Sequence, residues 1–258
     1  MDTSNDLVNY IHQFHLRLLA GKTGETIVGW TAPFLLLLAI TGLILWWPRK
    51  IFKISLSANR KRITFDLHNA LGIYSSVFLM IFAITGIIIH WDNDLTNWIN
   101  KVAHVPANQQ PARPQAHAPD AVPLNPDQLV AIAEHTEPGA RVGLISLPDN
   151  PQSPVNLSMK FPEDVTPGGR TRVALDQYTG KVLSATDSRT GPLGFRMVKV
   201  WNRAVHTGDI YGWPTKILAS FFSLMLPVMA ITGPLIWWNR RRKKNTAPPI
   251  AAAASGGI

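Results

Sequence analysis

The sequence predicts an α-helical membrane protein with three transmembrane helices and one small α+β extracytoplasmic domain. The first observation is composition: 46% of the 258 residues are hydrophobic and 16% are charged, and the mean hydropathy of +0.06 is high for a water-soluble chain. The second is clustering, because residues 27–47, 73–91 and 213–238 carry almost no charge and about 20 helical residues cross a bilayer. The third is that strand and turn patterns are confined to one stretch between the second and third clusters.

Basic residues predict how the chain is oriented. Six follow the first span and five follow the third: Arg49, Lys50, Lys53, Arg60, Lys61 and Arg62, then Arg240, Arg241, Arg242, Lys243 and Lys244. Under the positive-inside rule both groups lie in the cytoplasm, so the N-terminus and residues 92–212 lie outside. Because these residues also account for the net charge of +9, the basic balance indicates orientation in a lipid membrane, and no nucleic-acid partner is expected.

The predicted segments follow one another without overlap. They are an outer N-terminal amphipathic segment (1–26), the first transmembrane helix (27–47), a basic cytoplasmic loop (48–65), the second transmembrane helix (66–91), an outer helix extension and linker (92–124), the small domain (125–190), an interfacial segment (191–212), the third transmembrane helix (213–239) and a cytoplasmic tail (240–258). The N-terminus lacks the pattern of a cleavable signal peptide, so we expect the first span to direct its own insertion. The absence of cysteine excludes disulfides, thiolate metal sites and iron–sulfur clusters.

The small domain is predicted to pair one helix with a short antiparallel sheet. Asn125 is typical of a helix cap before residues 126–135, with proline at the first turn. Strands are expected at 141–147, 155–161, 171–175 and 181–184, separated by turn residues. Asp176 begins the turn that ends in Gly180, and we interpret it as a turn residue because no catalytic constellation surrounds it in the sequence.

An internal repeat marks all three spans. The spans end in Ala39-Ile-Thr-Gly-Leu-Ile-Leu-Trp-Trp47, Ala83-Ile-Thr-Gly-Ile-Ile-Ile-His-Trp91 and Ala230-Ile-Thr-Gly-Pro-Leu-Ile-Trp-Trp238. Small residues allow close helix packing and tryptophans anchor the interface, or the repeat makes room for a flat cofactor; the sequence leaves both readings open. The repeated threonines, Thr41, Thr85 and Thr232, are expected to bond backbone carbonyls, with hydrogen bonds to a cofactor ligand as the alternative.

The repeat draws attention to four histidines. His15 and His206 stand at the same spacing before Ala39 and Ala230, so each lies just outside the outer end of its span. His68 and His90 lie at the inner and outer ends of the second span, about six turns and 33 Å apart on one helix face. Ionisable residues at membrane spans are costly and are functional candidates.

Axial ligation of haem is the simplest use of these histidines, because the spans offer no cysteine or carboxylate. Two histidines on one iron suit electron transfer, since no position remains open for a substrate. His15, His90 and His206 lie on the outer side and His68 is alone on the inner side, and the sequence does not pair them. A zinc or copper site built from the outer histidines is the rival interpretation. The remaining histidines are interpreted as interfacial or surface residues: His12, His104, His117 and His135.

Several motifs resemble those of the PepSY-associated transmembrane family. Asp66-Leu-His-Asn-Ala-Leu-Gly72 opens a span that ends in Thr85-Gly86, and His206-Thr-Gly208 is followed by Thr232-Gly233 and Trp237-Trp238. Residues 125–187, which include Leu175-Asp-Gln-Tyr-Thr-Gly-Lys-Val-Leu183, resemble a PepSY domain. The resemblance extends from about His15 to Lys244.

The family includes iron-regulated proteins of the bacterial inner membrane, some of them haem-containing reductases of ferric siderophores. The resemblance therefore implies one or two b-type haems held by His15, His68, His90 and His206. It also implies electron flow from a cytoplasmic or membrane donor to a ferric chelate in the periplasm. Larger members have four spans, and this chain resembles them from the second span onward. A short member, a homodimer and a half-protein are therefore alternatives, and the partner ligand of His68 is in question.

Two other functions stay open from the sequence. PepSY domains also occur in protease propeptides, so the outer domain is alternatively a membrane-anchored module that binds or restrains an envelope protease or another partner. A metal-handling accessory subunit of a transporter would use the outer histidines without haem. The chain has no dinucleotide fingerprint, so a reductase activity needs a separate donor, and the sequence does not decide between a reductase and a subunit of one.

Overall fold

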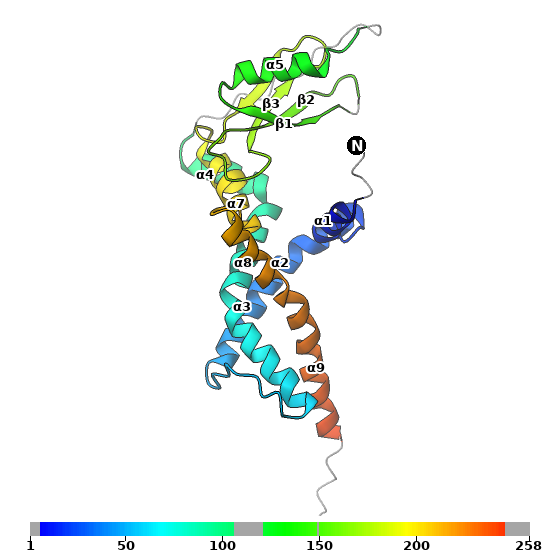
Figure 1. The fold of residues 1–258 in the computed structure, drawn as a ribbon, viewed down its shortest axis with the longest axis vertical. Coiled ribbons are helices and arrows are strands. Elements are labelled where there is room, and N and C mark those ends of the chain that lie inside the picture. Colours follow the sequence, from blue (N-terminus) through cyan, green and yellow to red (C-terminus); the bar gives the residue numbers. More distant parts are fainter. Residues whose placement is uncertain (1–5, 106–120, 149, 246–258) are drawn as a thin grey trace, which may run out of the picture. The chain divides into compact units, whose positions relative to one another are not determined.

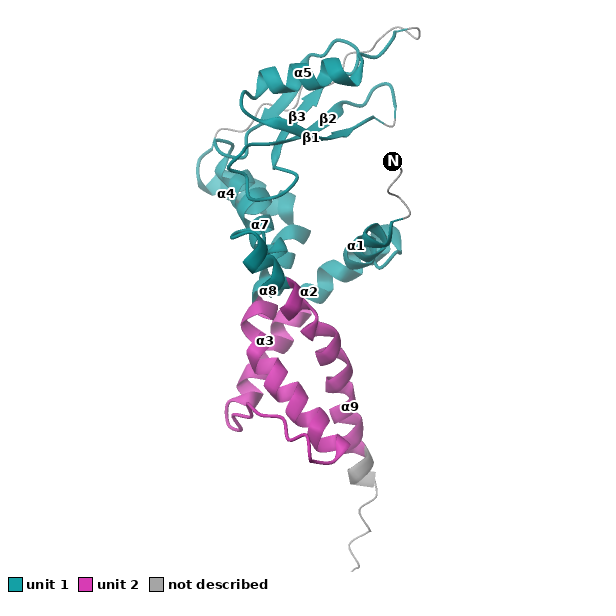
Figure 2. Cartoon of the chain, in the orientation of Figure 1, with its two compact units in different colours: residues 1–33, 81–219 teal, residues 34–80, 220–258 magenta. Residues whose placement is uncertain are grey.

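The computed structural model describes residues 6–105, 121–148 and 150–245. Most of the predicted linker, residues 106–120, and the end of the predicted tail, after residue 245, lie outside the described residues. The chain divides into two compact units, residues 1–33 with 81–219 and residues 34–80 with 220–258 (Figure 2). The first unit contains the sheet and three of the four candidate histidines, and the second contains His68.

Three helices of the described chain are long and apolar enough to cross a membrane. They are α2 (Gly21–Trp46), α3 (Arg60–His90) and the stretch Trp213–Arg241, which joins α8 (Trp213–Ser223) to α9 (Met225–Asn245). Their apolar side chains project outward, with Leu45 73% and Ile231 62% exposed. A helix that exposes apolar residues all round is stable in lipid and costly in water, so the predicted three-span fold is confirmed.

The helices are longer than the apolar clusters that predicted them. The first begins at Gly21 instead of residue 27, and the second begins at Arg60 instead of residue 66. Asn59 accepts a hydrogen bond from the backbone N–H of Arg62 at 3.0 Å and so caps this early start. The helical backbone therefore continues beyond the hydrophobic stretch. Residues 60–65 of the predicted basic loop belong to α3.

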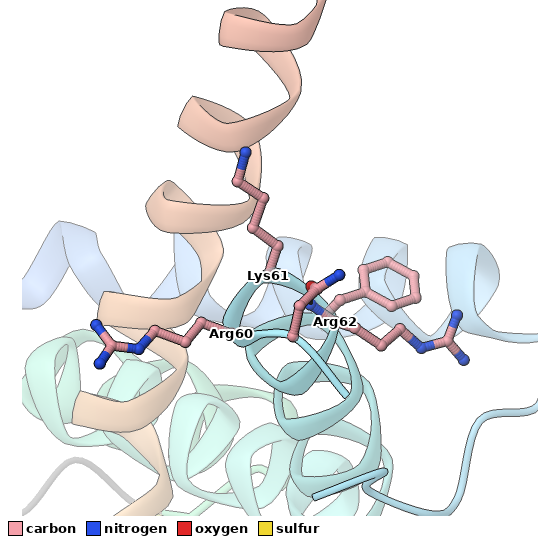
Figure 3. Close-up of a pocket in the computed structure, with 5 residues that line it drawn as sticks. Arg60, Lys61 and Arg62 are labelled. Atoms are coloured by element: carbon pink, nitrogen blue, oxygen red, sulfur yellow. Dashed lines mark hydrogen bonds between the residues drawn. The ribbon is translucent and has the colours of Figure 1, made fainter. Parts of the chain in front are cut away.

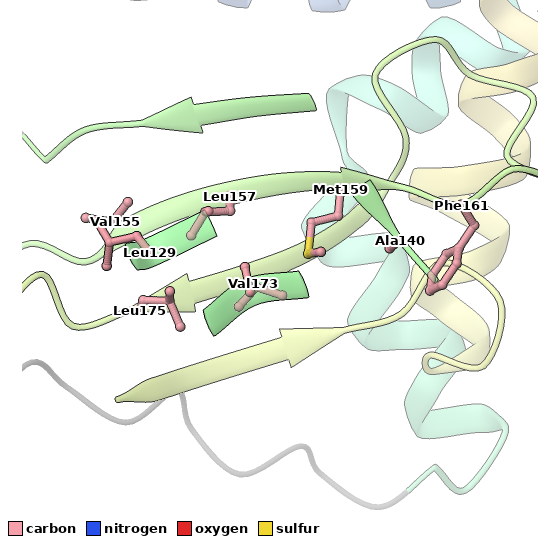
Figure 4. Packing of buried hydrophobic residues seen from close by; sticks show 9 residues of the cluster. Leu129, Ala140, Val155, Leu157, Met159, Phe161, Val173 and Leu175 are labelled. Atoms are coloured by element: carbon pink, nitrogen blue, oxygen red, sulfur yellow. The ribbon is translucent and has the colours of Figure 1, made fainter. Parts of the chain in front are cut away.

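The small α+β domain is one helix on a four-stranded antiparallel sheet (Figure 1). The helix is α5 (Pro126–Thr136), and the strands β1 (Arg141–Ser146), β2 (Val155–Lys160), β3 (Thr171–Leu175) and β4 (Val182–Thr186) pair in sequence order. Alternate residues of β2 and β3 face the helix and build the core, which Figure 4 shows. The core residues are Leu129, Ala133, Ala140, Val155, Leu157, Met159, Phe161, Val173 and Leu175.

Local chemistry in this domain follows the sequence interpretation. Asn125 accepts from the N–H of Asp127 at 3.0 Å, while Gln128 reaches back to the N–H of Asn125, which forms a capping box. The carboxylate of Asp176 accepts from the N–H groups of Tyr178 and Thr179, both at 3.0 Å, and Gly180 supplies a φ of +69°. Asp176 is thus a turn residue, as predicted.

Four short helices connect the sheet domain to the membrane helices of its own unit. They are α4 (Asp92–Val102), α6 (Leu193–Phe195), the π-helical turn η1 (Arg196–Trp201) and α7 (Asn202–Thr207). Gly194 lets α6 pack on α4, because a Cβ there would lie 2.3 Å from the carbonyl oxygen of Thr96. The side chain of Asn202 donates to the carbonyl of Thr85 at 3.2 Å, which fixes α7 against α3.

The N-terminal helix α1 (Leu7–Arg17) folds back beside the start of α2. Gly24 permits this approach, since a Cβ on it would lie 1.6 Å from the carbonyl oxygen of Arg17. The helix exposes Val8, Ile11 and Phe14, which agrees with the predicted amphipathic segment. Its last turn carries His15.

Candidate functional site

Two of the four candidate histidines lie close together in the first unit. The imidazole of His15, in the last turn of α1, and that of His206, in α7, have ring centres 6.2 Å apart and ring planes inclined by 36°. Their equal spacing from the repeat marked them as related residues, but the sequence did not reveal that they lie together. The structure brings this pair together.

A hydrogen bond from α3 fixes the orientation of His206. Its Nδ1 lies 2.7 Å from Oγ1 of Thr85, and the same oxygen lies 2.7 Å from the carbonyl oxygen of Ile81. A carbonyl only accepts, so the single hydroxyl proton of Thr85 is donated to Ile81, and the hydroxyl oxygen accepts from Nδ1–H of His206. The Nε2 atom of His206 therefore keeps its lone pair, the form in which imidazole binds a metal.

The electrostatics of the outer site favour a neutral His206. Burial, followed by repulsion from His15 and Arg203, lowers the pKa of His206 to about 4. The ring consequently carries no proton on Nε2 at neutral pH, and its lone pair is available without a deprotonation step. Beneath it lies Gly86, where a Cβ would come within 3.7 Å of Cε1 of His206.

The second unit contains the same arrangement around His68. Its Nδ1 lies 2.7 Å from Oγ1 of Thr232, and that hydroxyl lies 2.7 Å from the carbonyl oxygen of Val228. The carbonyl of Val228 accepts the single hydroxyl proton of Thr232, so Nδ1 of His68 carries the proton and its Nε2 keeps a free lone pair. A Cβ on Gly233 would lie 3.5 Å from Cε1 of His68. In this unit no second histidine ring contacts His68 among the described residues.

The threonine–glycine pair of the repeat is thus a histidine-holding unit in two of its three copies. All three threonines donate to a backbone carbonyl of their own helix, as predicted from the sequence. The second role, accepting from a histidine, was left as the alternative and is present at Thr85 and Thr232. In the third copy Thr41 bonds only the carbonyls of Leu37 and Leu38 within its helix, and Gly42 faces open space.

His90 occupies a different environment in the first unit. Its ring lies on Gly29 of α2, where a Cβ would be 2.1 Å from Cε1 of His90, and it meets the ring of Trp91 edge-on at 4.6 Å. Trp91 in turn meets Trp30 edge-on at 5.7 Å. His90 is therefore packed on α2 beside the tryptophans, and within the described chain its ring contacts neither His15 nor His206.

The comparison with protein families gives the chain its relatives. The sequence model described as the PepSY-associated TM region matches residues 2–240. The chain belongs to this family. No curated protein matches the chain. Membership of the PepSY-associated transmembrane family agrees with the three apolar helices and the small antiparallel sheet, and it confirms the resemblance carried by the sequence motifs.

Within this family member, the metal-ligand geometry limits the rival interpretations. The described residues contain no group of three or more histidine, aspartate or glutamate side chains that could hold a metal ion. A zinc or copper centre built from His15, His90 and His206 would need all three side chains around one ion. The structure brings two of them, His15 and His206, close together.

A basic hollow lies at the start of α3, away from the outer histidines in sequence. It is lined by Asn59, Arg60, Lys61, Arg62 and Phe65, three of which are labelled in Figure 3. Arg62 pairs with the buried carboxylate of Asp66 at 2.9 Å, and Asp66 also accepts from the N–H of Ser55. These lining residues end the predicted basic loop, and all but Asn59 belong to the first two turns of α3. Their positive charges are among those used to predict the orientation.

Proposed function

We propose that this protein is a haem-binding electron-transfer protein of the bacterial inner membrane that helps reduce ferric chelates on the periplasmic side. The observation that carries the proposal is the spacing of His15 and His206. The imidazole ring centres are 6.2 Å apart, a separation at which both side chains could hold one haem iron.

The hydrogen bond from His206 to Thr85 supports the same use. Histidines that bind metals commonly donate their other ring N–H to an acceptor, which fixes the tautomer and raises the basicity of the ligand. Haem b, when bound, would supply a one-electron iron couple. His15 and His206 would both hold the haem iron, and an iron with two histidine ligands suits electron transfer more than substrate binding to the metal.

The proposal extends to orientation and partners. The basic groups after the first and third spans support a cytoplasmic C-terminus, with the N-terminus and residues 92–212 in the periplasm. A cytoplasmic or membrane electron donor delivers the electron, and a ferric chelate receives it. His68, held by Thr232, is the candidate ligand of a second haem, and its second ligand then comes from another chain, such as a second copy in a homodimer.

The test is an absorbance spectrum of the detergent-purified chain before and after dithionite, with haem quantified as the pyridine haemochrome. We expect a Soret band and sharp α and β bands on reduction, lost in His15→Ala and His206→Ala and retained in His135→Ala. His135 is an exposed histidine of α5 and serves as the control. A chain that stays colourless after expression with a haem supply would exclude the proposal and favour an anchored PepSY module that binds an envelope partner.

A further inference from the structure

Three arginines gather near His206 on the outer side of the first unit. Arg203 lies in α7, one turn before His206, and Arg170 and Arg172 flank the first residue of β3. Burial, then the positive charges of Arg203 and Arg172, lowers the pKa of Arg170 to about 10. Burial and Arg203 also lower the pKa of Arg172. The three guanidinium groups are therefore close enough to repel one another, and Arg203 acts on His206 as well.

No carboxylate of the described chain forms an ion pair with this arginine cluster, defined as Arg170, Arg172 and Arg203. The two acids within electrostatic range of Arg170 are Asp209 and Asp164. Asp209 pairs with Lys216 at 2.9 Å and accepts from the hydroxyl of Thr207. Asp164 accepts from the N–H of Phe161 at 2.8 Å and from the hydroxyl of Ser188 at 2.9 Å. Both carboxylates are thus engaged elsewhere.

The cluster also contains donors without acceptors. The Nε atoms of Arg170 and Arg203 are buried and have no hydrogen-bond partner among the described residues. Burying a charged donor without an acceptor is costly, and buried polar groups are normally satisfied by protein, water or an ion. An anion bound among the three arginines would offset the repulsion between their positive charges. It would also give the two unpaired Nε–H groups an acceptor. Arg172 is partly satisfied, since it donates to the hydroxyl of Ser158.

We propose that Arg170, Arg172 and Arg203 form a carboxylate-binding site beside the pair His15–His206. The planar fork of a guanidinium group matches a carboxylate and holds it with two parallel hydrogen bonds. This inference rests on the proposed function for the source of the carboxylates. They belong either to the propionate side chains of the haem held by the two histidines or to a carboxylate-bearing ferric chelate that docks above it. The chemistry recognised by the arginines is the same in both cases.

The test measures two quantities on the detergent-purified full chain. One is haem content as the pyridine haemochrome, and the other is the affinity for ferric citrate, a carboxylate-bearing chelate, by isothermal titration calorimetry. Arg203→Gln and Arg170→Gln each remove one fork, whereas Arg203→Lys keeps the charge and removes the fork. Arg141→Gln is the matched control, because Arg141 has an 84% exposed side chain paired with Glu134.

Loss of charged hydrogen bonds predicts an effect of about ten- to a hundredfold on the affinity that uses the site. Lower haem content with unchanged ferric citrate affinity assigns the site to the haem propionates. Weaker ferric citrate binding with unchanged haem content assigns it to the chelate. Both results support the carboxylate site. Unchanged haem content and unchanged ferric citrate affinity in both glutamine variants, relative to Arg141→Gln, would overturn it.

Two further results distinguish failure of the carboxylate site from misfolding of a variant and from failure of the proposed function. If the glutamine variants do not fold, Arg203→Lys decides, because it retains the positive charge and should still weaken binding severalfold if the fork is used. If the unsubstituted chain binds no haem, the proposed function fails on that ground alone. An affinity for ferric citrate that depends on the arginines would then still support the carboxylate site, and its independence from them would overturn it.

Discussion

The site of His206 and the site of His68, called the outer and the inner site after the proposed orientation, each contain a threonine–glycine pair that holds the histidine, and they differ in the residues near it. At both, a threonine hydroxyl lies 2.7 Å from Nδ1 of a histidine and a glycine leaves room beside the ring. At the outer site a second imidazole, that of His15, stands 6.2 Å from His206. At the inner site the described residues provide His68 alone. Under the proposed function, one chain completes the outer site and supplies half of an inner one.

The first way to break this comparison is to remove one ligand at a time. A haem held by His15 and His206 would lose one of its two protein ligands without His206, so His206→Ala should remove most of the haem bound by a single chain. His15→Ala should do the same. His68→Ala should leave the outer signal intact. The measurement is haem per chain by pyridine haemochrome, with the position of the reduced α band.

The opposite result would reverse the assignment. If His68→Ala removed the haem and His206→Ala retained it, the complete site would lie at the inner end and the pairing of His15 with His206 would have another role. Equal loss in both variants would indicate two haems per chain, each dependent on its histidine.

The second prediction separates His90 from the outer pair. A Cβ at position 29 would lie 2.1 Å from the ring of His90, so Gly29→Ala should displace that ring and cost about 1–3 kcal/mol through overpacking. Gly42→Ala is the matched control on the same helix, because nothing lies within 4 Å of Gly42 and alanine favours a helix. Thermal unfolding in detergent gives the stability, and haem content should be unchanged in both. Loss of haem in Gly29→Ala alone would assign His90 as a ligand.

The third prediction uses the low pKa of His206 in the haem-free chain. The ring has a pKa of about 4 in the folded chain, against 6.5 ordinarily, so the unfolded chain binds more protons between these values and stability rises with pH there. Above pH 6.5 the neutral His206 ring makes its full contribution to the free energy of unfolding. This contribution, about 3 kcal/mol at most, is lost as the pH falls towards 4. Unfolding temperatures across this range should fall more steeply for the unsubstituted chain than for His206→Gln. Parallel curves would show that His206 is not buried as a neutral ring.

Much of the fold was predictable because it follows from local sequence. The spans are apolar on every face, and the turn at Asp176 and the cap at Asn125 use side chains that bond backbone groups within three residues. These features need no knowledge of tertiary packing. The ends of several elements differ from the prediction. The helices α2 and α3 begin six residues earlier, because a helix continues past the hydrophobic residues that reveal it, and the fourth strand is Val182–Thr186 instead of 181–184.

The sequence identifies the histidines of the candidate site but does not show which of them lie together. The repeat singled out His15 and His206, but their meeting depends on the fold of α1 beside α2, which Gly24 allows through a contact with Arg17. The hydrogen bonds of Thr85 and Thr232 likewise join residues that are 121 and 164 positions apart. Long-range contacts of this kind leave no local pattern. The signal that pointed to them was the recurrence of threonine beside glycine in every span.

The last and smallest effect tests the holding unit itself. Thr85→Val keeps the shape of the side chain and removes the acceptor for Nδ1–H of His206, which should make the ligand a weaker donor to ferric iron. If the ferric form loses about 1 kcal/mol more stabilisation than the ferrous form, the midpoint potential of the outer haem rises by about 40 mV. Thr41→Val is the matched control, because Thr41 sits in the same repeat and holds no histidine among the described residues. Redox titration of the reduced α band measures both. Thr232→Val should leave the midpoint potential of the outer haem unchanged and shift that of an inner haem wherever a second haem binds. Equal shifts in Thr85→Val and Thr41→Val would show that the repeat acts through helix packing and not through its histidine.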